Sequence, residues 1–142
     1  MKTIKQVVKE SARNKALHKQ FIKFGIVGVA NTVIDWTVYF ILSRFVPFFA
    51  SNLVYAKAIS FLFGVTNSYY WNRKWTFRSL NNSLSIFIPF FMLNVVSIII
   101  NNGVMFVALT YLSLPEIIAL GSATAVTLLW NFVGSKLFVF KA

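Results

Sequence analysis

The sequence predicts an all-α membrane protein with four transmembrane helices, arranged as two parallel two-helix repeats with both termini in the cytoplasm. Three observations predict this fold: an apolar composition, four long apolar runs, and basic residues concentrated on one side of those runs. Of the 142 residues, 58% are hydrophobic and 12% are charged, whereas soluble domains have about 45–50% and about 25%. The composition therefore argues against a soluble domain.

Residues 1–22 form a basic segment that we expect on the cytoplasmic side. As a helix, this segment would place Ile4, Leu17 and Phe21 on one side and most of its lysines elsewhere, which is typical of an amphipathic helix on anionic lipid. A partly disordered basic tail is the alternative. A cleaved signal peptide is not expected, because the next apolar run exceeds the usual 7–15 residues and no convincing cleavage site follows it.

Residues 23–142 form the predicted transmembrane domain. About 20 apolar residues are needed for a helix to cross roughly 30 Å of hydrocarbon. A short turn at residues 47–49 makes the first two spans a hairpin, and Pro115 separates the last two. The four spans are predicted at Phe24–Ser43, Leu53–Trp71, about Ile86–Tyr111 and Glu116 to about Ser135.

The basic residues predict the orientation of the spans. Twelve Lys and Arg residues fall on the side that holds both termini, against Arg44 and Lys57 on the other side. The positive-inside rule therefore places both termini in the cytoplasm. A net charge of +11 would suggest nucleic acid as the partner of a soluble chain. Here most cations flank apolar runs, so the predicted partner is membrane lipid and no nucleic acid is expected.

The sequence also predicts an internal repeat, with repeat 1 at about 23–78 and repeat 2 at about 84–142. Asp35 aligns with Asn101 at a shift of 66 residues, and Asn72–Phe77 aligns with Ser135–Phe140 at a shift of 63. Each repeat contains two spans and so starts and ends on the same side of the membrane. The repeats are therefore expected to be parallel, related by an axis along the membrane normal.

The strongest candidate for a functional role is Asp35, near the middle of the first span. An ionised carboxylate there costs at least a few kcal/mol, so Asp35 should face protein or water and have a partner. Asn31 lies one turn earlier on the same helix face, and Ser97 and Asn101 have the same spacing. These polar stripes either fix helix packing or line a substrate or ion pathway.

A second candidate site is the basic and aromatic cluster after the second span, which is formed by Asn72, Arg73, Lys74 and Trp75, with Arg78 beyond. Lys136 with Phe138 is a weaker copy. Such a cluster can hold a lipid phosphate, although any helix end in an aromatic belt looks similar. Lys57, one turn into the second span, either extends toward the outer interface or pairs with substrate or Asp35.

The sequence contains nothing that predicts an enzyme. Cysteine is absent, which excludes disulfides and thiolate sites, and His18 is the single histidine. There is also no motif of a hydrolase triad, a phosphate-binding glycine loop or paired catalytic carboxylates. We therefore expect no catalytic residues, metal or cofactor.

Several motifs together resemble the GtrA-like family of small four-helix membrane proteins. The resemblance covers about residues 21–140 and departs from the family at Ser135, Lys136 and Phe138, where the family often has an Asn-Arg pair and an aromatic residue. This departure weakens a symmetric two-site arrangement. The motifs are Phe21–Gly28, Asn31-Thr32 with Asp35, Ala56–Phe61, Asn67-Ser68, Asn72–Phe77 and Trp130-Asn131-Phe132.

The resemblance implies a multi-pass protein of the bacterial cytoplasmic membrane that flips an undecaprenyl-phosphate-linked sugar for glycosylation of teichoic acid or surface polysaccharide. Arg73, Lys74 and Lys136 would then capture the phosphate on the cytoplasmic side, and Lys57 would attract it toward the exit. Asn31, Asp35 and Asn101 would offer hydrogen bonds to the sugar hydroxyls midway across the membrane. The full set of expected substrate-binding residues is Asn31, Asp35, Lys57, Asn72, Arg73, Lys74, Trp75, Asn101, Asn131 and Lys136.

Two other functions fit the same residues. The first alternative is a non-transporting accessory subunit of a membrane glycosyltransferase, in which the polar stripes are helix contacts. The second is a small proton-coupled exporter that uses Asp35 as proton carrier. The expected partners are therefore polyprenyl-phosphate-linked sugar, membrane lipid and membrane glycosyltransferases. Four spans of this length are expected to enclose at most a narrow polar path, so a homodimer also fits the sequence, although no sequence feature specifies its interface.

Overall fold

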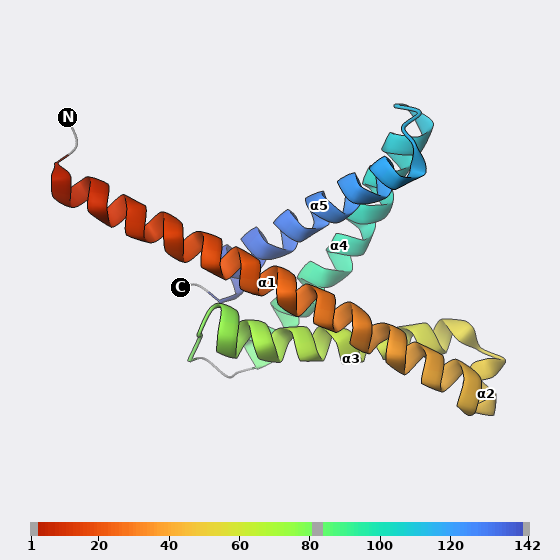
Figure 1. Ribbon diagram of the computed structural model, residues 1–142. Helices are drawn as coiled ribbons and strands as arrows, with labels where there is room; N and C mark the ends of the chain where they lie inside the picture. Colours follow the sequence, from red (N-terminus) through yellow and green to blue (C-terminus); the bar gives the residue numbers. More distant parts are fainter. Residues whose placement is uncertain (1–2, 81–83, 141–142) are drawn as a thin grey trace. The chain divides into compact units, whose positions relative to one another are not determined.

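The computed structural model describes residues 3–80 and 84–140, and none of the residues in these two ranges forms a strand (Figure 1). The described residues exclude the first two residues of the predicted segment 1–22 and the last two residues of the predicted domain 23–142. The helices are α1 (Ile4–Phe45), α2 (Pro47–Ala50), α3 (Leu53–Trp71), α4 (Leu84–Thr110) and α5 (Glu116–Gly134), and π-helices η1 (Asn72–Thr76) and η2 (Ser135–Val139) follow α3 and α5.

The chain divides into two compact units between Arg78 and Ser79. Unit 1 consists of α1, α2, α3 and η1, and unit 2 consists of α4, α5 and η2. In each unit two long helices pack against each other, and the second helix ends in a π-helical turn. The two units thus have the same order of main elements.

The turn of unit 1 contains a short helix rather than the tight loop predicted at residues 47–49. Val46 leaves the helical conformation with φ −114° and ψ 108°, and Pro47 then begins α2. A proline is favoured at this first helical position because its missing N–H would have no partner there. The side chain of Asn52 donates a hydrogen bond of 2.8 Å to the carbonyl of Phe48 and closes the turn.

Small residues at every fourth position allow close packing of the helices. The stripe in α3 consists of Ala56, Ser60, Gly64 and Ser68, all of which are buried. The matching positions of α5 are Ala119, Ala123, Thr127 and Asn131, of which the two alanines are buried. Small side chains let two helix backbones approach each other where lipid supplies no hydrophobic driving force between them.

Gly134 marks the tightest approach in unit 2. A Cβ atom at Gly134 would lie 2.3 Å from Cδ1 of Leu93, so the leucine side chain fills the space that any larger residue would need. One turn earlier, Nε1 of Trp130 donates a hydrogen bond of 3.3 Å to the carbonyl of Leu93. These contacts hold the end of α5 against α4.

Three helical segments are long and apolar enough to cross a membrane: Lys9–Phe45, Ser85–Thr110 and Ile118–Val139. They make the chain a multi-pass membrane protein, and their large exposed apolar side chains suit a lipid environment. Helix α3 has the predicted bounds of the second span but is not among these segments. Its polar residues, which include Lys57 and Asn67, lower its hydropathy, so a fourth span remains a prediction.

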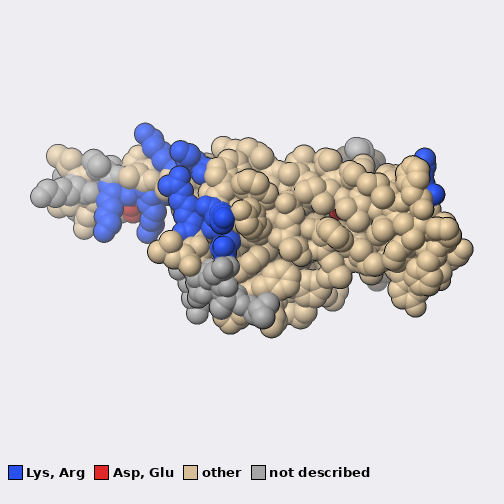
Figure 2. Space-filling model, turned by 90° about the horizontal axis from the view of Figure 1, so that it is seen from below, with Lys and Arg blue, Asp and Glu red and all other residues tan. Residues whose placement is uncertain are grey.

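Helix α1 continues without interruption from Ile4 to Phe45. The predicted cytoplasmic segment and the predicted first span therefore form a single helix (Figure 1, red to orange). At its start, the backbone N–H of Thr3 donates a hydrogen bond of 2.9 Å to Oε1 of Gln6, as in a capping box. Figure 2 shows most of the visible Lys and Arg side chains gathered on one part of the surface and a smaller group at the opposite end of the view, with largely uncharged surface between them.

Candidate functional site

Asp35 lies at the contact between α1 and α3, where its carboxylate has two side-chain partners. Nζ of Lys57 forms an ion pair with Oδ2, and the hydroxyl of Ser60 donates a hydrogen bond of 2.5 Å to Oδ1. The side chain of Asp35 is 19% exposed, whereas that of Lys57 is 53% exposed. Asp35 was expected to have a partner, and its partners lie on the neighbouring helix. Lys57 was expected either to extend toward the outer interface or to pair with substrate or Asp35, and in the structure it pairs with Asp35.

A second polar contact lies one turn from the ion pair. Nδ2 of Asn67 donates a hydrogen bond of 2.7 Å to Oδ1 of Asn31. Gly64 lies between the two contacts, and a Cβ atom there would be 3.4 Å from Cβ of Asp35 and 3.5 Å from the carbonyl oxygen of Asn31. The glycine thus lets the α3 backbone approach the polar face of α1. Asn31 and Asp35 both use this face, as the spacing predicted.

In unit 2, the equivalent of the ion pair is a neutral hydrogen bond. Asn101, which aligns with Asp35, donates a hydrogen bond of 3.1 Å to Oγ1 of Thr127. Thr127 aligns with Gly64, and its own hydroxyl donates a hydrogen bond of 2.6 Å to the carbonyl of Ala123. The aligned residues Asp35 and Asn101 therefore both bond to the second helix of their unit. In unit 1 the partners are charged, whereas in unit 2 they are an amide and a hydroxyl.

The basic and aromatic cluster after α3 is organised by η1. Asn72 is 1% exposed, and its Nδ2 donates a hydrogen bond of 3.1 Å to the hydroxyl of Ser68, so its side chain is directed into the unit. The guanidinium of Arg73 lies 5.9 Å from the ring centre of Tyr69. Lys74 has its Nζ 4.6 Å from the ring centre of Tyr70. Both cations therefore lie over tyrosines of the preceding turn, which is a favourable arrangement.

Trp75 is held by a residue of α1 that the sequence did not identify as part of the site. Nζ of Lys23 donates a hydrogen bond of 3.2 Å to the carbonyl of Trp75 and lies 4.8 Å from the centre of its ring. Lys23 belongs to the motif Phe21–Gly28 and directly precedes the apolar run. Its place in the sequence could therefore have identified it as a candidate site residue.

Both π-helical turns close in the same way. The backbone N–H of Phe77 donates to the carbonyl of Asn72 and that of Phe140 donates to the carbonyl of Ser135, each at 2.8 Å. The ring of Phe77 contacts that of Phe24, with 6.0 Å between centres, and the ring of Phe140 lies 5.7 Å from that of Phe90. Because π-helical turns are rare and concentrate at functional sites, both turns are candidates for a role in binding.

The remaining predicted site residues lie at the end of unit 2. Lys136 is a half-buried residue of η2. Asn131 is also half-buried, and its Oδ1 is buried without a hydrogen-bond partner. The hydroxyl of Ser135 is also buried without a hydrogen-bond partner, and so is Oδ1 of the aligned Asn72. Buried polar atoms normally have partners, so these unsatisfied atoms mark the η1 and η2 ends as places where further polar groups would be stabilising.

Ser60 and Asn67 complete the contacts of Asp35 and Asn31 but were not among the predicted site residues. The sequence did contain a signal for them. Lys57, Ser60, Gly64 and Asn67 are spaced by three or four residues and therefore share one face of α3.

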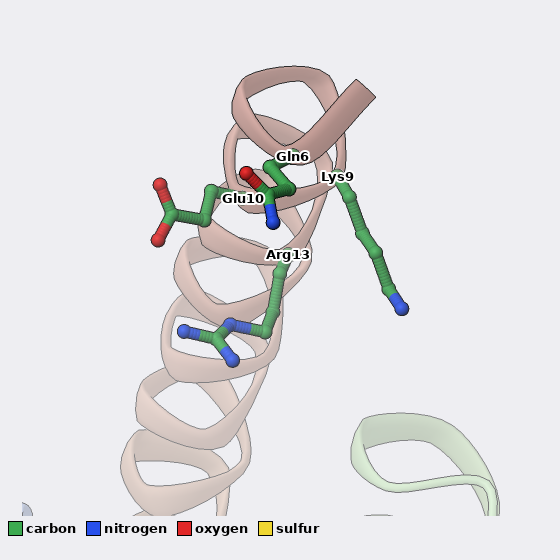
Figure 3. A pocket seen from close by; sticks show the side chains of 4 residues that line it. All are labelled: Gln6, Lys9, Glu10 and Arg13. Atoms are coloured by element: carbon green, nitrogen blue, oxygen red, sulfur yellow. The ribbon is translucent and has the colours of Figure 1, made fainter. Parts of the chain in front are cut away.

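The surface pocket at the start of α1 lacks the features of a built site. It is lined by Gln6, Lys9, Glu10 and Arg13, and Figure 3 shows that all four side chains project from the same helix. Among the residues whose placement is described, no group of three His, Asp or Glu side chains is positioned to hold a metal ion.

Sequence comparison matches residues 23–140 to the family described as GtrA/DPMS, transmembrane domain. The chain is similar to the "uncharacterized membrane protein YngA" of Bacillus subtilis, with 33% identity over 125 residues that cover 83% of this chain and 77% of the relative. It is also similar to the "bactoprenol-linked glucose translocase" of Shigella phage SfV, with 28% identity over 125 residues covering 87% and 96%. The "prophage bactoprenol-linked glucose translocase homolog" of Escherichia coli is 27% identical over 123 residues, with the same coverage.

Proposed function

The chain belongs to the GtrA/DPMS transmembrane domain family, and from this premise we propose that it moves a polyprenyl-phosphate-linked sugar from the cytoplasmic to the outer leaflet of a bacterial cytoplasmic membrane. The names of two related proteins, which describe translocation of bactoprenol-linked glucose, support this class of substrate. In this role the chain carries out no chemical conversion. It supplies a polar route for the headgroup, while the polyprenyl chain stays in lipid.

The observation that carries the proposal is the ion pair of Asp35 and Lys57 at the contact between α1 and α3, together with the Asn31–Asn67 hydrogen bond. Helix packing alone does not require charge at this point, because unit 2 packs its two helices with the neutral Asn101–Thr127 contact. Charged groups in an apolar span are costly and usually serve a function. We therefore assign Asp35 and Lys57 to the translocation route.

The other candidate residues would act at successive depths. Arg73 and Lys74 of η1 and Lys136 of η2 are suited to bind the phosphate, because guanidinium and ammonium groups both recognise phosphate oxygens. Trp75 and the buried Asn72 would support them at headgroup depth. The amides of Asn31, Asn101 and Asn131 would bond to sugar hydroxyls.

The proposal includes an orientation and partners. Four spans with cytoplasmic termini would place η1 and η2 on the cytoplasmic side, where the phosphate enters. Glycosyltransferases that attach the sugar inside and transfer it to teichoic acid or another surface polysaccharide would supply and consume the substrate. A homodimer would widen the polar route that one chain provides.

Reconstitution tests this function directly. The purified chain is placed in liposomes that contain a polyprenyl-phosphate-linked sugar, and a membrane-impermeant sugar oxidant measures how much of it reaches the outer leaflet. We expect transfer that depends on the chain and is lost in the D35N/K57Q double variant. If the wild-type chain moves nothing alone but does so when a glycosyltransferase is added, the accessory function replaces this proposal.

A further inference from the structure

We propose that unit 1 contains a binding site for a lipid-borne phosphate, in a pocket between α1 and the end of η1 that Arg78 alone of the predicted basic and aromatic cluster lines. The pocket has a volume of about 190 Å³. Three cations line it, and none of the described residues around it is acidic. Its polar and charged lining residues, which we call the cationic pocket, are Lys19, Gln20, Lys23, Thr76 and Arg78.

Thr76 provides an unused hydrogen-bonding group in this pocket. It is 3% exposed, and its Oγ1 atom is buried without a hydrogen-bond partner. A buried hydroxyl without a partner is unfavourable, so a ligand oxygen at this position would remove an energetic penalty. Because Lys19, Lys23 and Arg78 surround the same space, the complementary ligand is an anion with several acceptor oxygens, as a phosphate is.

The backbone of Arg78 provides a second, independent observation. Arg78 has a φ of 52°, in the left-handed region that favours glycine. A long charged side chain at such a position is a strained choice, and strain of this kind concentrates at ligand sites. Arg78 follows the C-cap Phe77 of η1 and lines the cationic pocket.

Unit 2 contains a pocket at the equivalent position that lacks these groups. It has a volume of about 290 Å³ and is lined by Ser85, Pro89 and Val139 among others. These three residues align with Lys19, Lys23 and Thr76 by the same shifts that align the helices. The residue that aligns with Arg78, Lys141, lies outside the described residues. The fold thus forms this pocket in both units, but the described lining combines cations with a free hydroxyl in unit 1 alone.

An adjoining apolar groove indicates that the phosphate is attached to a lipid. The groove has a volume of about 480 Å³, is lined by Ile22, Ile26 and Trp75 together with Lys15 and His18, and shares Lys19 and Lys23 with the cationic pocket. Ile22 and Ile26 lie one turn apart on α1 and lead from the cations into the apolar half of the helix. A hydrocarbon chain in this groove would continue from a phosphate in the pocket into the bilayer.

This inference rests on the proposed function for the identity of the lipid and deepens it by locating the phosphate on entry. Binding is measured separately from transport, with the full chain in detergent micelles and native mass spectrometry as the readout. The probes are polyprenyl monophosphate, the corresponding polyprenol and inorganic phosphate at equal concentration. We expect saturable binding of the first and at least about tenfold weaker binding of the other two.

Three variants test the pocket residues, and one controls for charge. K19S and T76V introduce the residues found at the aligned positions of unit 2, and R78G removes the guanidinium together with the backbone strain. We expect K19S and R78G to weaken binding by about tenfold each and T76V by about threefold. K9S removes the same charge from the same helix outside the pocket and should retain wild-type affinity.

The outcomes separate the site from the transport function. Equal weakening by K9S and K19S, or unchanged binding in both T76V and R78G, would overturn the site even where the wild-type chain moves lipid-linked sugar in liposomes. Binding that follows the expected pattern in a chain that moves nothing would support the site and reject the transport function. Tight binding of inorganic phosphate would contradict a lipid ligand. R78G should unfold at or above the wild-type temperature, so its loss of binding would not reflect misfolding.

Discussion

The hydroxyl of Ser60 donates a hydrogen bond of 2.5 Å to Oδ1 of Asp35 across the contact between α3 and α1. The other carboxylate oxygen pairs with Lys57, so both oxygens of the acid have a partner on the same neighbouring helix. A carboxylate among apolar helices is stable only with such partners. The same carboxylate that we assign to translocation therefore also holds α1 and α3 together.

The two partners of the ion pair should differ in their effect on stability. K57Q leaves Asp35 charged on a short side chain that cannot reach the membrane interface, so we expect a loss of about 2 kcal/mol in the free energy of unfolding. D35N leaves Lys57 unpaired, but its long side chain can extend toward water, which limits the loss to about 1 kcal/mol. Thermal unfolding in detergent measures both.

The D35N/K57Q double variant is the control for this pair. It introduces an amide where unit 2 has Asn101, and it should unfold closer to the wild type than K57Q does. Transport should nevertheless fall at least about tenfold. Wild-type transport by the double variant would remove the charges from the mechanism.

Loss of the Ser60 hydroxyl should be costly because the side chain is fully buried. S60A removes a charge-assisted hydrogen bond, and we expect about 1.5 kcal/mol of destabilisation. T37V is the comparison, since the exposed Thr37 donates to the carbonyl of Val33 in its own helix and its loss should change stability by less than about 0.5 kcal/mol. Equal effects of the two variants would mean that Ser60 has no special role.

The Asn31–Asn67 contact should show energetic coupling in a double-mutant cycle. Each single leucine variant leaves one amide without its partner, whereas the double variant removes both. Cycles of this kind in membrane proteins give about 0.6 kcal/mol on average and up to about 1.7 kcal/mol. We expect a coupling in that range from the unfolding of N31L, N67L and N31L/N67L. A coupling indistinguishable from zero would contradict the 2.7 Å hydrogen bond.

The close approach at Gly64 should limit the size of the residue there. An added Cβ would make ordinary contacts of 3.4 and 3.5 Å, so G64A should be nearly neutral. G64L would force α3 away from Asp35, and we expect a loss of about 1–3 kcal/mol together with impaired transport. Gly121 of α5 is the control, because a Cβ atom there would have nothing within 4 Å, and G121L should not destabilise the chain.

The sequence predicted helix positions better than contacts. The predicted bounds of α3 are confirmed, and those of α4 and α5 differ by two residues at most, because proline and polar breaks interrupt the apolar runs at those points. The family resemblance is also confirmed. In contrast, helical periodicity indicates which face a residue occupies but not which neighbour it meets. Pairing with Asp35 was one of the alternatives predicted for Lys57, and the choice among them required the structure. The same is true of Ser60, which was not predicted as a partner.

The π-helical turns and the cationic pocket were also beyond the sequence. The sequence pattern of a helix does not show whether its backbone hydrogen bonds reach the fourth preceding residue, as in an α-helix, or the fifth, as in a π-helix. In the sequence, η1 and η2 therefore look like ordinary ends of α-helices. The pocket combines Lys19 of α1 with Thr76 of η1, which are far apart in the chain. Only the packing of η1 against α1 brings them together.

The predicted topology can be tested with single cysteines, since the chain has none of its own. S51C lies in the turn between α2 and α3, and S113C lies between α4 and α5. Both should react with a membrane-impermeant thiol reagent in intact cells. L80C, which follows η1 and is fully exposed, should react only after the membrane is opened. Labelling of both S51C and L80C in intact cells would contradict α3 as a membrane span.

The length of α1 exceeds what a bilayer can enclose. At 1.5 Å per residue, its 42 residues extend for about 63 Å, about twice the thickness of the hydrocarbon core. The lysine-bearing part of the helix therefore extends beyond the hydrocarbon core. Because this part is continuous with the helix that carries Asp35, a tilt of it would also move the charged pair.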